Sequence, residues 1–179
     1  MTIWLTADLH IGHFNIIRYC NRPFDDLEDM HQTIIRKWNE RVGEADIVYI
    51  LGDLGFVKGS GSEISGFLKK VNGKIYLIRG NHDKGEKKWY LNHGVREVHD
   101  NYVILERSLL SHYPLEPDIH DGKRTKRIKE RLSAIYREND LSFHYYAHTH
   151  RPPAKGEDFM NVGVDLHDFY PVPFSKSNL

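Results

Sequence analysis

Short apolar runs alternate along the chain with segments of helical periodicity, and this alternation predicts an α/β fold. Seven runs rich in Ile, Val, Leu and Tyr predict strands, and they cover 2–7, 46–51, 74–79, 101–106, 108–112, 142–147 and 159–163. Several of these runs are almost continuously apolar, which is typical of strands buried on both faces. We therefore expect helices to cover the sheets that the strands form.

Three segments predict helices. In the clearest, 26–42, apolar residues recur at three- and four-residue steps behind Asp25-Asp26, two residues of a type that caps helix N-termini. A second helix is expected over 62–71. A third is expected to begin in the basic stretch 123–131 and to end near residue 137. The tail after Pro171 contains a second proline and is expected to be extended.

Composition and charge describe an ordinary globular chain. The 179 residues are 40% hydrophobic and 28% charged, and 25 Lys and Arg balance 25 Asp and Glu, so global charge indicates no partner. This length predicts one domain over 1–179. Cys20 is the only cysteine, which fits a reducing compartment, and the sequence shows neither a signal peptide nor an apolar run long enough to span a membrane. We therefore expect a cytoplasmic protein without a membrane partner.

Residue types that bind metal ions follow five of the predicted strands. They are Asp8 with His10, Asp53, Asn81 with His82, His112, and His148 with His150. Ligand sites in open α/β sheets gather at the carboxyl ends of strands, so five such ends can supply one site. Where the backbone stays extended, the two residues of the first and last pairs point the same way. Gly52 and Gly80 precede Asp53 and Asn81, and glycine permits a sharp turn that directs the next side chain into the crevice.

These residues, in this order, resemble the calcineurin-like metallophosphoesterase family. Its motifs run Asp-x-His, Gly-Asp, Gly-Asn-His-Asp or Gly-Asn-His-Glu, His, and Gly-His-x-His, and the match extends from residue 8 to about 163. The resemblance implies an α/β fold in which a two-sheet sandwich is flanked by helices. One position departs from the motifs: Ala147 replaces the glycine of the last one, which requires a negative φ there. A second histidine after the first motif, His13, resembles a small phage- or bacterium-type branch of the family.

The resemblance also implies a role for each site residue. Three would hold a first divalent ion and three a second; the first set is Asp8, His10 and His150, and the second is Asn81, His112 and His148. Asp53 would bridge the two ions, and His82 would be the catalytic histidine rather than a ligand. Ligation by Asp, Asn and His without a thiolate suits Mn²⁺, Fe, Ni, Co or Zn better than Ca²⁺, and we favour Mn²⁺.

The expected function is hydrolysis of a phosphodiester by a hydroxide that bridges two metal ions, with His82 protonating the leaving oxygen. A small nucleotide, a cyclic phosphodiester or a nucleic-acid end is the expected substrate, because 179 residues leave no room for the capping or DNA-binding domains of repair nucleases. A phosphomonoesterase that acts on nucleotides or proteins is the alternative. A non-catalytic interaction scaffold on the same fold is a third interpretation, which the complete set of ligand types disfavours. The oligomeric state stays open.

Three features have both a site interpretation and an ordinary one. His13 either lies near the bound phosphate or caps the following helix, and Arg79 either contacts phosphate or pairs with a carboxylate. The segment 113–137 is interpreted as a basic loop and helix at the rim of the site, since 123–131 holds six Lys or Arg and one Glu. This rim either steers a polyanion or is simply a solvated helix face. No aromatic residue is interleaved with these charges, so a long single-strand track is not predicted.

The other polar residues near the motifs are expected to play supporting parts. Asp83 is predicted to orient His82 or to cap the next helix. Turn and supporting roles are predicted for Asn161, Gly163 and Asp165. Surface or packing roles are predicted for His31, His93, His99, His120, His144 and His167. Cys20 is predicted to be a partly buried small hydrophobic residue.

Overall fold

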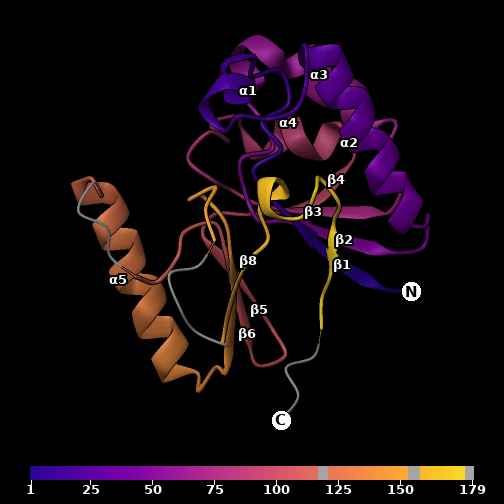
Figure 1. Ribbon diagram of the computed structural model, residues 1–179. Helices are drawn as coiled ribbons and strands as arrows, with labels where there is room; N and C mark the ends of the chain where they lie inside the picture. Colours follow the sequence, from indigo (N-terminus) through magenta and orange to yellow (C-terminus); the bar gives the residue numbers. More distant parts are fainter. Residues whose placement is uncertain (117–120, 153–157, 176–179) are drawn as a thin grey trace.

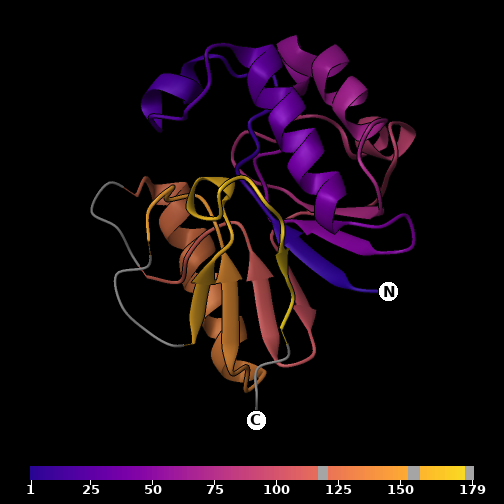
Figure 2. The ribbon, with the colours of Figure 1, turned by 45° about the vertical axis from the view of Figure 1, so that its right-hand side comes forward.

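The computed structural model describes residues 1–116, 121–152 and 158–175, and these form two β-sheets packed face to face with helices on both outer sides (Figure 1 and Figure 2). The predicted α/β sandwich is therefore confirmed. Residues 117–120 of the expected rim, and His120 with them, lie outside the described residues. None of the helices in the described part of the chain has the length and apolar composition needed to cross a lipid bilayer.

The first sheet has the strand order β4-β3-β2-β1-β9. Its strands are β1 Ile3–Thr6, β2 Ile47–Ile50, β3 Lys74–Ile78, β4 Val95–His99 and β9 Val172–Pro173. The first four run parallel, and β9 pairs antiparallel with β1. Thr6 lies opposite Ile50, which lies opposite Leu77, so β1, β2 and β3 end at one edge of the sheet.

The second sheet has the order β5-β6-β7-β8. Its strands are β5 Tyr102–Leu105, β6 Ser108–Ser111, β7 Phe143–Tyr146 and β8 Phe159–Asn161. The hairpin β5-β6 is antiparallel, whereas β6, β7 and β8 run parallel. The two sheets meet through an isolated parallel bridge between Ala7 and Gly163, just beyond the ends of β1 and β8. The carboxyl ends of the parallel strands in both sheets therefore share one edge of the sandwich.

Four helices cover the outer face of the first sheet, and one covers the second (Figure 1). They are α1 Asn15–Tyr19, α2 Leu27–Arg41, α3 Val57–Leu68, α4 Lys87–Asn92 and α5 Lys123–Glu138, with a 3₁₀ turn at Val164–Leu166. Asp26 caps α2, because its carboxylate accepts the Asp29 N–H at 2.9 Å. The backbone of α3 is not helical at residues 58–60, where Gly59 has a φ of 122°.

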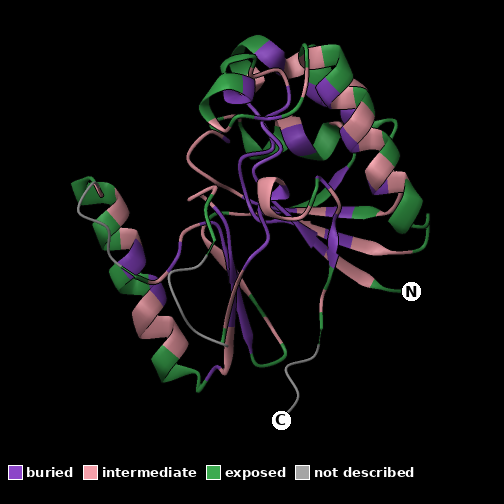
Figure 3. Ribbon diagram, in the orientation of Figure 1, coloured by how far each residue is buried: buried purple, intermediate pink, exposed green. Residues whose placement is uncertain are grey.

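Three apolar clusters hold the layers together (Figure 3). The largest packs α1 to α4 on the first sheet around the fully buried Trp38. The second fills the space between the sheets, where Leu5, Leu51 and Tyr145 face one another. The third fastens α5 to the second sheet through Leu132. Strands with apolar neighbours on both faces explain the nearly continuous apolar runs in the sequence.

All seven predicted strands and all three predicted helices are present. The expected helix 62–71 begins earlier, at Val57, and ends at Leu68. Strand β4 was not predicted, because it carries charged residues. The helices expected after His13 and after Asp83 are α1 and α4, whose bounds were not predicted because both are shorter than two turns. The extended tail contains β9.

Candidate functional site

The predicted metal-binding residues meet at the shared edge of the two sheets. The first sheet supplies four of them from the ends of β1, β2 and β3, and the second sheet supplies three from the ends of β6 and β7; they are Asp8, His10, Asp53 and Asn81, then His112, His148 and His150. The backbone N–H of His148 donates to Asp8 Oδ2 at 3.0 Å, which ties the sheets together within the site. Burial is nearly complete for Asp8, His10, Asp53 and His112.

Five of the site residues have left-handed backbone conformations. Positive φ angles occur at Asp8 (57°), His10 (51°), Asp53 (54°), His148 (77°) and His150 (52°). Residues other than glycine adopt this left-handed conformation only where surrounding contacts compensate its cost of about 1–3 kcal/mol each. The predicted alignment of each pair required an extended backbone; this condition is not met, because Asp8, His10, His148 and His150 lie in left-handed turns. Ala147 is buried and is not among the positive-φ residues, which satisfies the condition that replacing glycine imposed.

Asp8, His10 and His150 form the first group, with ligand atoms within 4.8 Å of one another. His150 Nδ1–H donates to Asp165 Oδ2 at 2.7 Å, so the Nε2 atom carries the lone pair of the neutral ring. This Nε2 lies 3.4 Å from His10 Nε2. Asp8 Oδ1 is buried and accepts no hydrogen bond from the described residues. A buried anionic oxygen without a donor fits a bound cation.

Asp53, His112 and His148 form the second group, and Asn81 adjoins it. His112 Nδ1–H donates to the Leu51 carbonyl at 2.9 Å, which leaves His112 Nε2 unprotonated in the neutral ring. Asn81 Oδ1 lies 3.0 Å and His148 Nδ1 3.1 Å from this Nε2 atom. An amide oxygen and imidazole nitrogens that converge in this way fit the coordination sphere of a cation.

Asp53 lies between the two groups. Its Oδ2 atom is 3.7 Å from His10 Nε2 and 3.6 Å from His112 Nε2, while Oδ1 accepts the His82 N–H at 2.9 Å. Burial alone would raise the pKa of Asp53, but the facing rings of His112, His10 and His82 lower it below its ordinary value. The carboxylate is therefore ionised at neutral pH and in reach of both groups.

Two of the site histidines are neutral, and a third holds a proton that a cation would have to displace. Burial lowers the pKa of His10 to about 3 and that of His148 to about 4, so both rings are neutral at physiological pH. His150 differs: burial opposes its charge, but hydrogen bonds to Asp165 and Cys20 and the charge of Asp8 together raise its pKa to about 10. A metal ion would displace the proton of His150 from Nε2, and Asp165 would retain the proton on Nδ1.

Asp83 joins the two loops that carry the central ligands. Its Oδ2 accepts the N–H groups of Asp53 at 2.7 Å and Gly80 at 2.8 Å, and its Oδ1 accepts the Leu54 N–H at 3.1 Å. The carboxylate thus positions the backbone of both motifs, instead of orienting His82 or capping α4 as predicted. Gly80 does not adopt a positive φ; it is needed because a Cβ there would collide with Asp53 Oδ1.

Arg22 supports the first group, and its role was not predicted from the sequence. Its side chain is buried, ion-pairs with Asp165 at 2.7 Å and donates to the Asp8 carbonyl at 2.7 Å. Asp165 in turn holds His150, so Arg22 fixes both the turn at Asp8 and the orientation of the His150 ring. Arg22 stands outside every motif, and no pattern in the sequence indicates this partner 143 residues away.

A hollow of about 320 Å³ opens over the two groups, and His82 and His13 line it. His82 has 28% of its side chain exposed, and its Nε2 lies 3.9 Å from Asp53 Oδ2. The His13 ring centroid is 5.6 Å from that of His10 and 5.9 Å from that of His82. Cys20 lines the same hollow and is partly buried. These positions suit contact with a molecule bound over the two groups.

Arg79 lies beside the site, and its guanidinium has protein partners. It donates to the carbonyls of Asp83 at 2.9 Å and Gly85 at 2.7 Å, and it pairs with Asp100 at 3.4 Å. The pairing with a carboxylate was one of its two predicted roles. Its contact with phosphate stays a prediction, as do the ligand assignments of the two groups.

Comparisons with known proteins agree with this geometry. A sequence model of the calcineurin-like phosphoesterases matches residues 1–152. An uncharacterized protein of Methanocaldococcus jannaschii is 51% identical over 86 residues, which cover 48% of this chain and 49% of that protein. The gene 66 protein of Mycobacterium phage L5 is 40% identical over 82 residues, which cover 45% of this chain and 39% of that protein. The chain therefore spans about half, or less, of the length of these curated relatives.

Two solved structures share the fold. A protein of unknown function from Aquifex aeolicus superposes with a TM-score of 0.79 at 24% identity, with 96% of this chain and 95% of that chain covered. The Pseudomonas putida nuclease MPE superposes with a TM-score of 0.51 at 20% identity, with 83% of this chain and 61% of that chain covered. At these identities the likeness concerns the fold alone.

Proposed function

The chain belongs to the calcineurin-like phosphoesterase family, and from that premise we propose that it hydrolyses phosphodiesters with two divalent metal ions. Asp8, His10 and His150 would hold one ion, and Asn81, His112 and His148 the other; Asp53 would bridge them. We favour Mn²⁺, because the donors are carboxylate and amide oxygens together with imidazole nitrogens.

One observation carries this proposal: two groups of side chains that can ligate a metal ion converge on neighbouring points. His112 directs Nδ1 to the Leu51 carbonyl, and its Nε2 lies 3.0 Å from Asn81 Oδ1 and 3.1 Å from His148 Nδ1. Asp8 Oδ1 is buried without a donor among the described residues. An unsatisfied buried polar atom costs about 1–3 kcal/mol, and a bound cation would remove that cost at Asp8.

The residues of the site divide the chemistry between them. When bound, the two ions supply positive charge that offsets the charge of the ester and lowers the pKa of a water molecule between them. Asp83 and Arg22 hold the loops and rings that present the ligands. His82 reaches the hollow from the side of Asp53, and it would protonate the leaving oxygen. His13, with an unpartnered buried Nδ1 among the described residues, would orient the phosphate from the same hollow.

The shape of the surface favours a diester over a monoester. The hollow over the two groups and a second hollow of about 460 Å³ both include Asn81 in their lining. A phosphorus atom near Asn81 would therefore have space on two sides. A diester has a substituent for each side, whereas a monoester would leave one side empty.

Kinetics on matched esters test the proposal. We expect the manganese-loaded protein to cleave bis-aryl phosphodiesters with a kcat/KM at least equal to that for aryl monoesters. His82→Ala should lower kcat/KM about 10²–10⁴-fold for a ribose leaving group and much less for an aryl one, because a phenolate needs little protonation. His93→Ala, outside the hollow, is the matched control and should leave both rates unchanged.

Two results would contradict these roles. A strong preference for monoesters would indicate a phosphatase instead. Equal losses on ribose and aryl leaving groups would remove His82 from the role of proton donor.

A further inference from the structure

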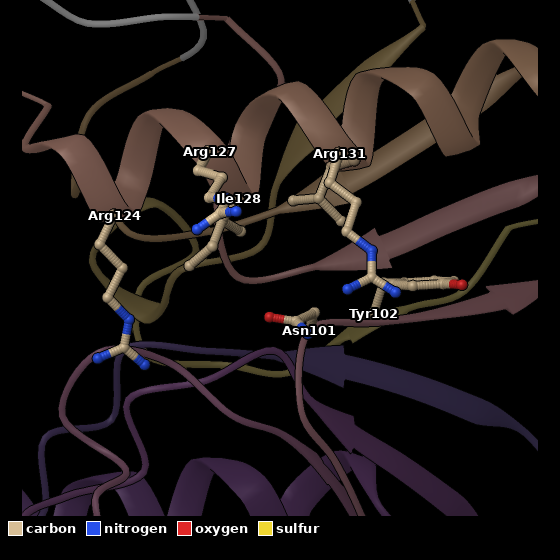
Figure 4. Close-up of a pocket in the computed structure, with 7 residues that line it drawn as sticks. Asn101, Tyr102, Arg124, Arg127, Ile128 and Arg131 are labelled. Atoms are coloured by element: carbon tan, nitrogen blue, oxygen red, sulfur yellow. The ribbon is translucent and has the colours of Figure 1, made fainter.

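Three arginines share one face of α5 and have no hydrogen-bond or ion-pair partner among the described residues. Arg124, Arg127 and Arg131 stand three and four residues apart, which places them on one side of the helix, and all three are exposed. All three line one hollow together with Asn101 and Tyr102, and in Figure 4 the Arg131 side chain extends toward Tyr102, whereas that of Arg124 extends away from it. Within residues 1–116, 121–152 and 158–175, no hydrogen bond or ion pair joins any of the three guanidinium groups to another residue. They are therefore free to bind a ligand.

Other residues of α5 fasten the helix, so the arginines are not needed for that purpose. Leu132 is buried against Leu109 of β6. Lys129 is only 4% exposed; it donates to the Glu116 carbonyl at 2.8 Å and ion-pairs with Asp121 at 2.8 Å. These contacts fix the direction in which the arginine face points.

Two connected hollows link the arginine face to the candidate metal site. Arg124, Arg127 and Arg131 line a hollow of about 370 Å³ together with Tyr102. This hollow shares Arg124 and Asn101 with the hollow of about 460 Å³ that reaches Asn81. A chain-like ligand with one phosphate at the metals could thus continue along α5 as far as Arg131.

Positive charge dominates this path, although the whole chain is neutral. Five basic side chains line the two hollows, and the only acidic ones among the described residues are Asp83 and Asp100. Asp83 is buried and bound to backbone N–H groups, and Asp100 is paired with Lys87 at 2.9 Å and with Arg79 at 3.4 Å. The arginines thus provide a local field that would attract a polyanion.

We propose that α5 and the start of β5 form a subsite for single-stranded nucleic acid, which binds the strand next to the phosphate under attack. Arg124 and Arg131 are separated by about 10 Å along the helix axis, farther than one phosphate group can bridge, so they would bind successive phosphates. The Tyr102 ring and the Asn101 amide, which line the same hollow as the arginines, would contact a base by stacking and by hydrogen bonding.

Exposed aromatic rings at the other end of the path support a nucleic acid over other polyanions. Tyr19 of α1 lines the hollow over the metal groups and is 75% exposed, and the neighbouring Phe14 is 53% exposed. Aromatic rings stack on bases of any sequence, whereas they contribute nothing to the binding of inorganic polyphosphate. The aromatic side chains of this path come from α1 and β5, so the basic stretch of α5 does not need to supply them.

This inference rests on the proposed phosphoesterase function, so the test pairs binding with turnover. The probe is a labelled single-stranded octanucleotide with phosphorothioate linkages, bound to the manganese-loaded protein and followed by fluorescence anisotropy. The triple variant Arg124→Ala, Arg127→Ala and Arg131→Ala should weaken binding at least about tenfold. The slope of log Kd against log salt concentration should also fall by about 2, because each lost phosphate contact with a single strand lowers that slope by about 0.7.

A matched control removes the same charge from other positions of α5. Lys123→Ala, Lys126→Ala and Arg137→Ala combined affect exposed residues that line neither hollow, and this variant should bind the octanucleotide within about threefold of the wild type. Tyr102→Ala should weaken binding roughly tenfold, whereas Tyr102→Phe, which keeps the ring, should not. Equal losses in the two triple variants would overturn the inference, as would wild-type binding of duplex DNA or inorganic polyphosphate as tight as that of the single strand.

Turnover of a bis-aryl diester in the same preparations separates the two claims. If the wild type cleaves the aryl diester but the arginine variant retains full affinity for the octanucleotide, only the subsite is overturned. If the wild type cleaves no diester, the proposed function fails, and the subsite as part of a substrate path fails with it. The inference is supported if the arginine variant loses kcat/KM, relative to the wild type, at least tenfold more for a short oligonucleotide than for the aryl diester.

Discussion

His144 illustrates how burial determines the charge of a single side chain. The residue is fully buried in β7, and Ser111 Oγ lies 2.8 Å from its Nε2. The Ser111 hydroxyl donates its proton to the Tyr113 carbonyl, so His144 Nε2–H must be the donor to Ser111, and Nδ1 has no partner among the described residues. Burial lowers the pKa of His144 to about 3, which keeps the ring neutral in the folded chain.

This depressed pKa predicts a loss of stability in mild acid. The unfolded ring titrates near pH 6.5 and the folded ring near 3, so between these values the unfolded state binds more protons. The free energy of unfolding should therefore fall as pH drops below about 6.5, and His144 should contribute about 2 kcal/mol of loss between pH 7 and 5. Urea titrations in the presence of a chelator at both pH values, on the wild type and His144→Phe, measure the difference. An equal loss in the two proteins would contradict it.

The sequence predicted which residue types form the site, but not which atoms they present. Strand-end positions identified His112 and His150 as candidates. Their tautomers depend on Leu51, 61 residues from His112, and on Asp165, 15 residues from His150. Such partners are set by the packing of the two sheets, which a single sequence does not disclose. Arg22 was missed for the same reason.

At the scale of elements, the site depends on a connection between the ends of β2 and β3. Asp83, which follows β3, accepts N–H groups from both Gly80 and the 53–55 turn that follows β2. Burial and the nearby charge of Asp53 raise the pKa of Asp83 to about 6, so the carboxylate is largely ionised at pH 7 and serves as a strong acceptor. Removing this acceptor should loosen both loops at once.

Asp83→Asn tests this connection with little change in shape. The amide presents an NH₂ group to backbone N–H donors, which leaves buried donors unpaired and should lower the free energy of unfolding by about 2 kcal/mol or more. Affinity for Mn²⁺ should fall as well, because Asp53 and Asn81 lie on the loosened loops. Asp100→Asn is the control: its side chain is 57% exposed, and such surface pairs contribute about 0–1 kcal/mol. Urea denaturation and metal titration of both variants measure these effects. If Asp83→Asn and Asp100→Asn had the same stability and the same affinity for Mn²⁺, the role of Asp83 would be refuted.

Elements with a long apolar period were predictable, and those defined by tertiary contact were not. The stripe of α2 and the apolar runs of the seven strands predicted their positions closely. In contrast, only part of β4 is apolar: Val95 and Val98 are buried, and the charged residues between them are exposed. The segment forms a strand because it pairs with β3. The conformation of the ligand pairs also escaped prediction, because left-handed φ angles at Asp8 and His148 arise from the junction of the sheets.

For the whole molecule, the two sheets act as separate supports for one site. The first sheet carries Asp8, His10, Asp53 and Asn81, and the second carries His112, His148 and His150. Both proposed metal positions draw ligands from both sheets, with Asp53 between them. Metal binding should therefore hold the two sheets together, and the proposed hydrolysis requires two bound ions per chain.

Anomalous X-ray scattering from crystals of the manganese-loaded protein would count and locate the ions. We expect two peaks per chain. One should be bound by Asp8, His10 and His150 and the other by Asn81, His112 and His148, with Asp53 touching both and His82 touching neither. In Asp53→Asn crystals both peaks should weaken, since a neutral amide replaces the anion between two cations. No peak, or peaks that avoid Asp8, Asp53 and His148, would refute the two-metal site.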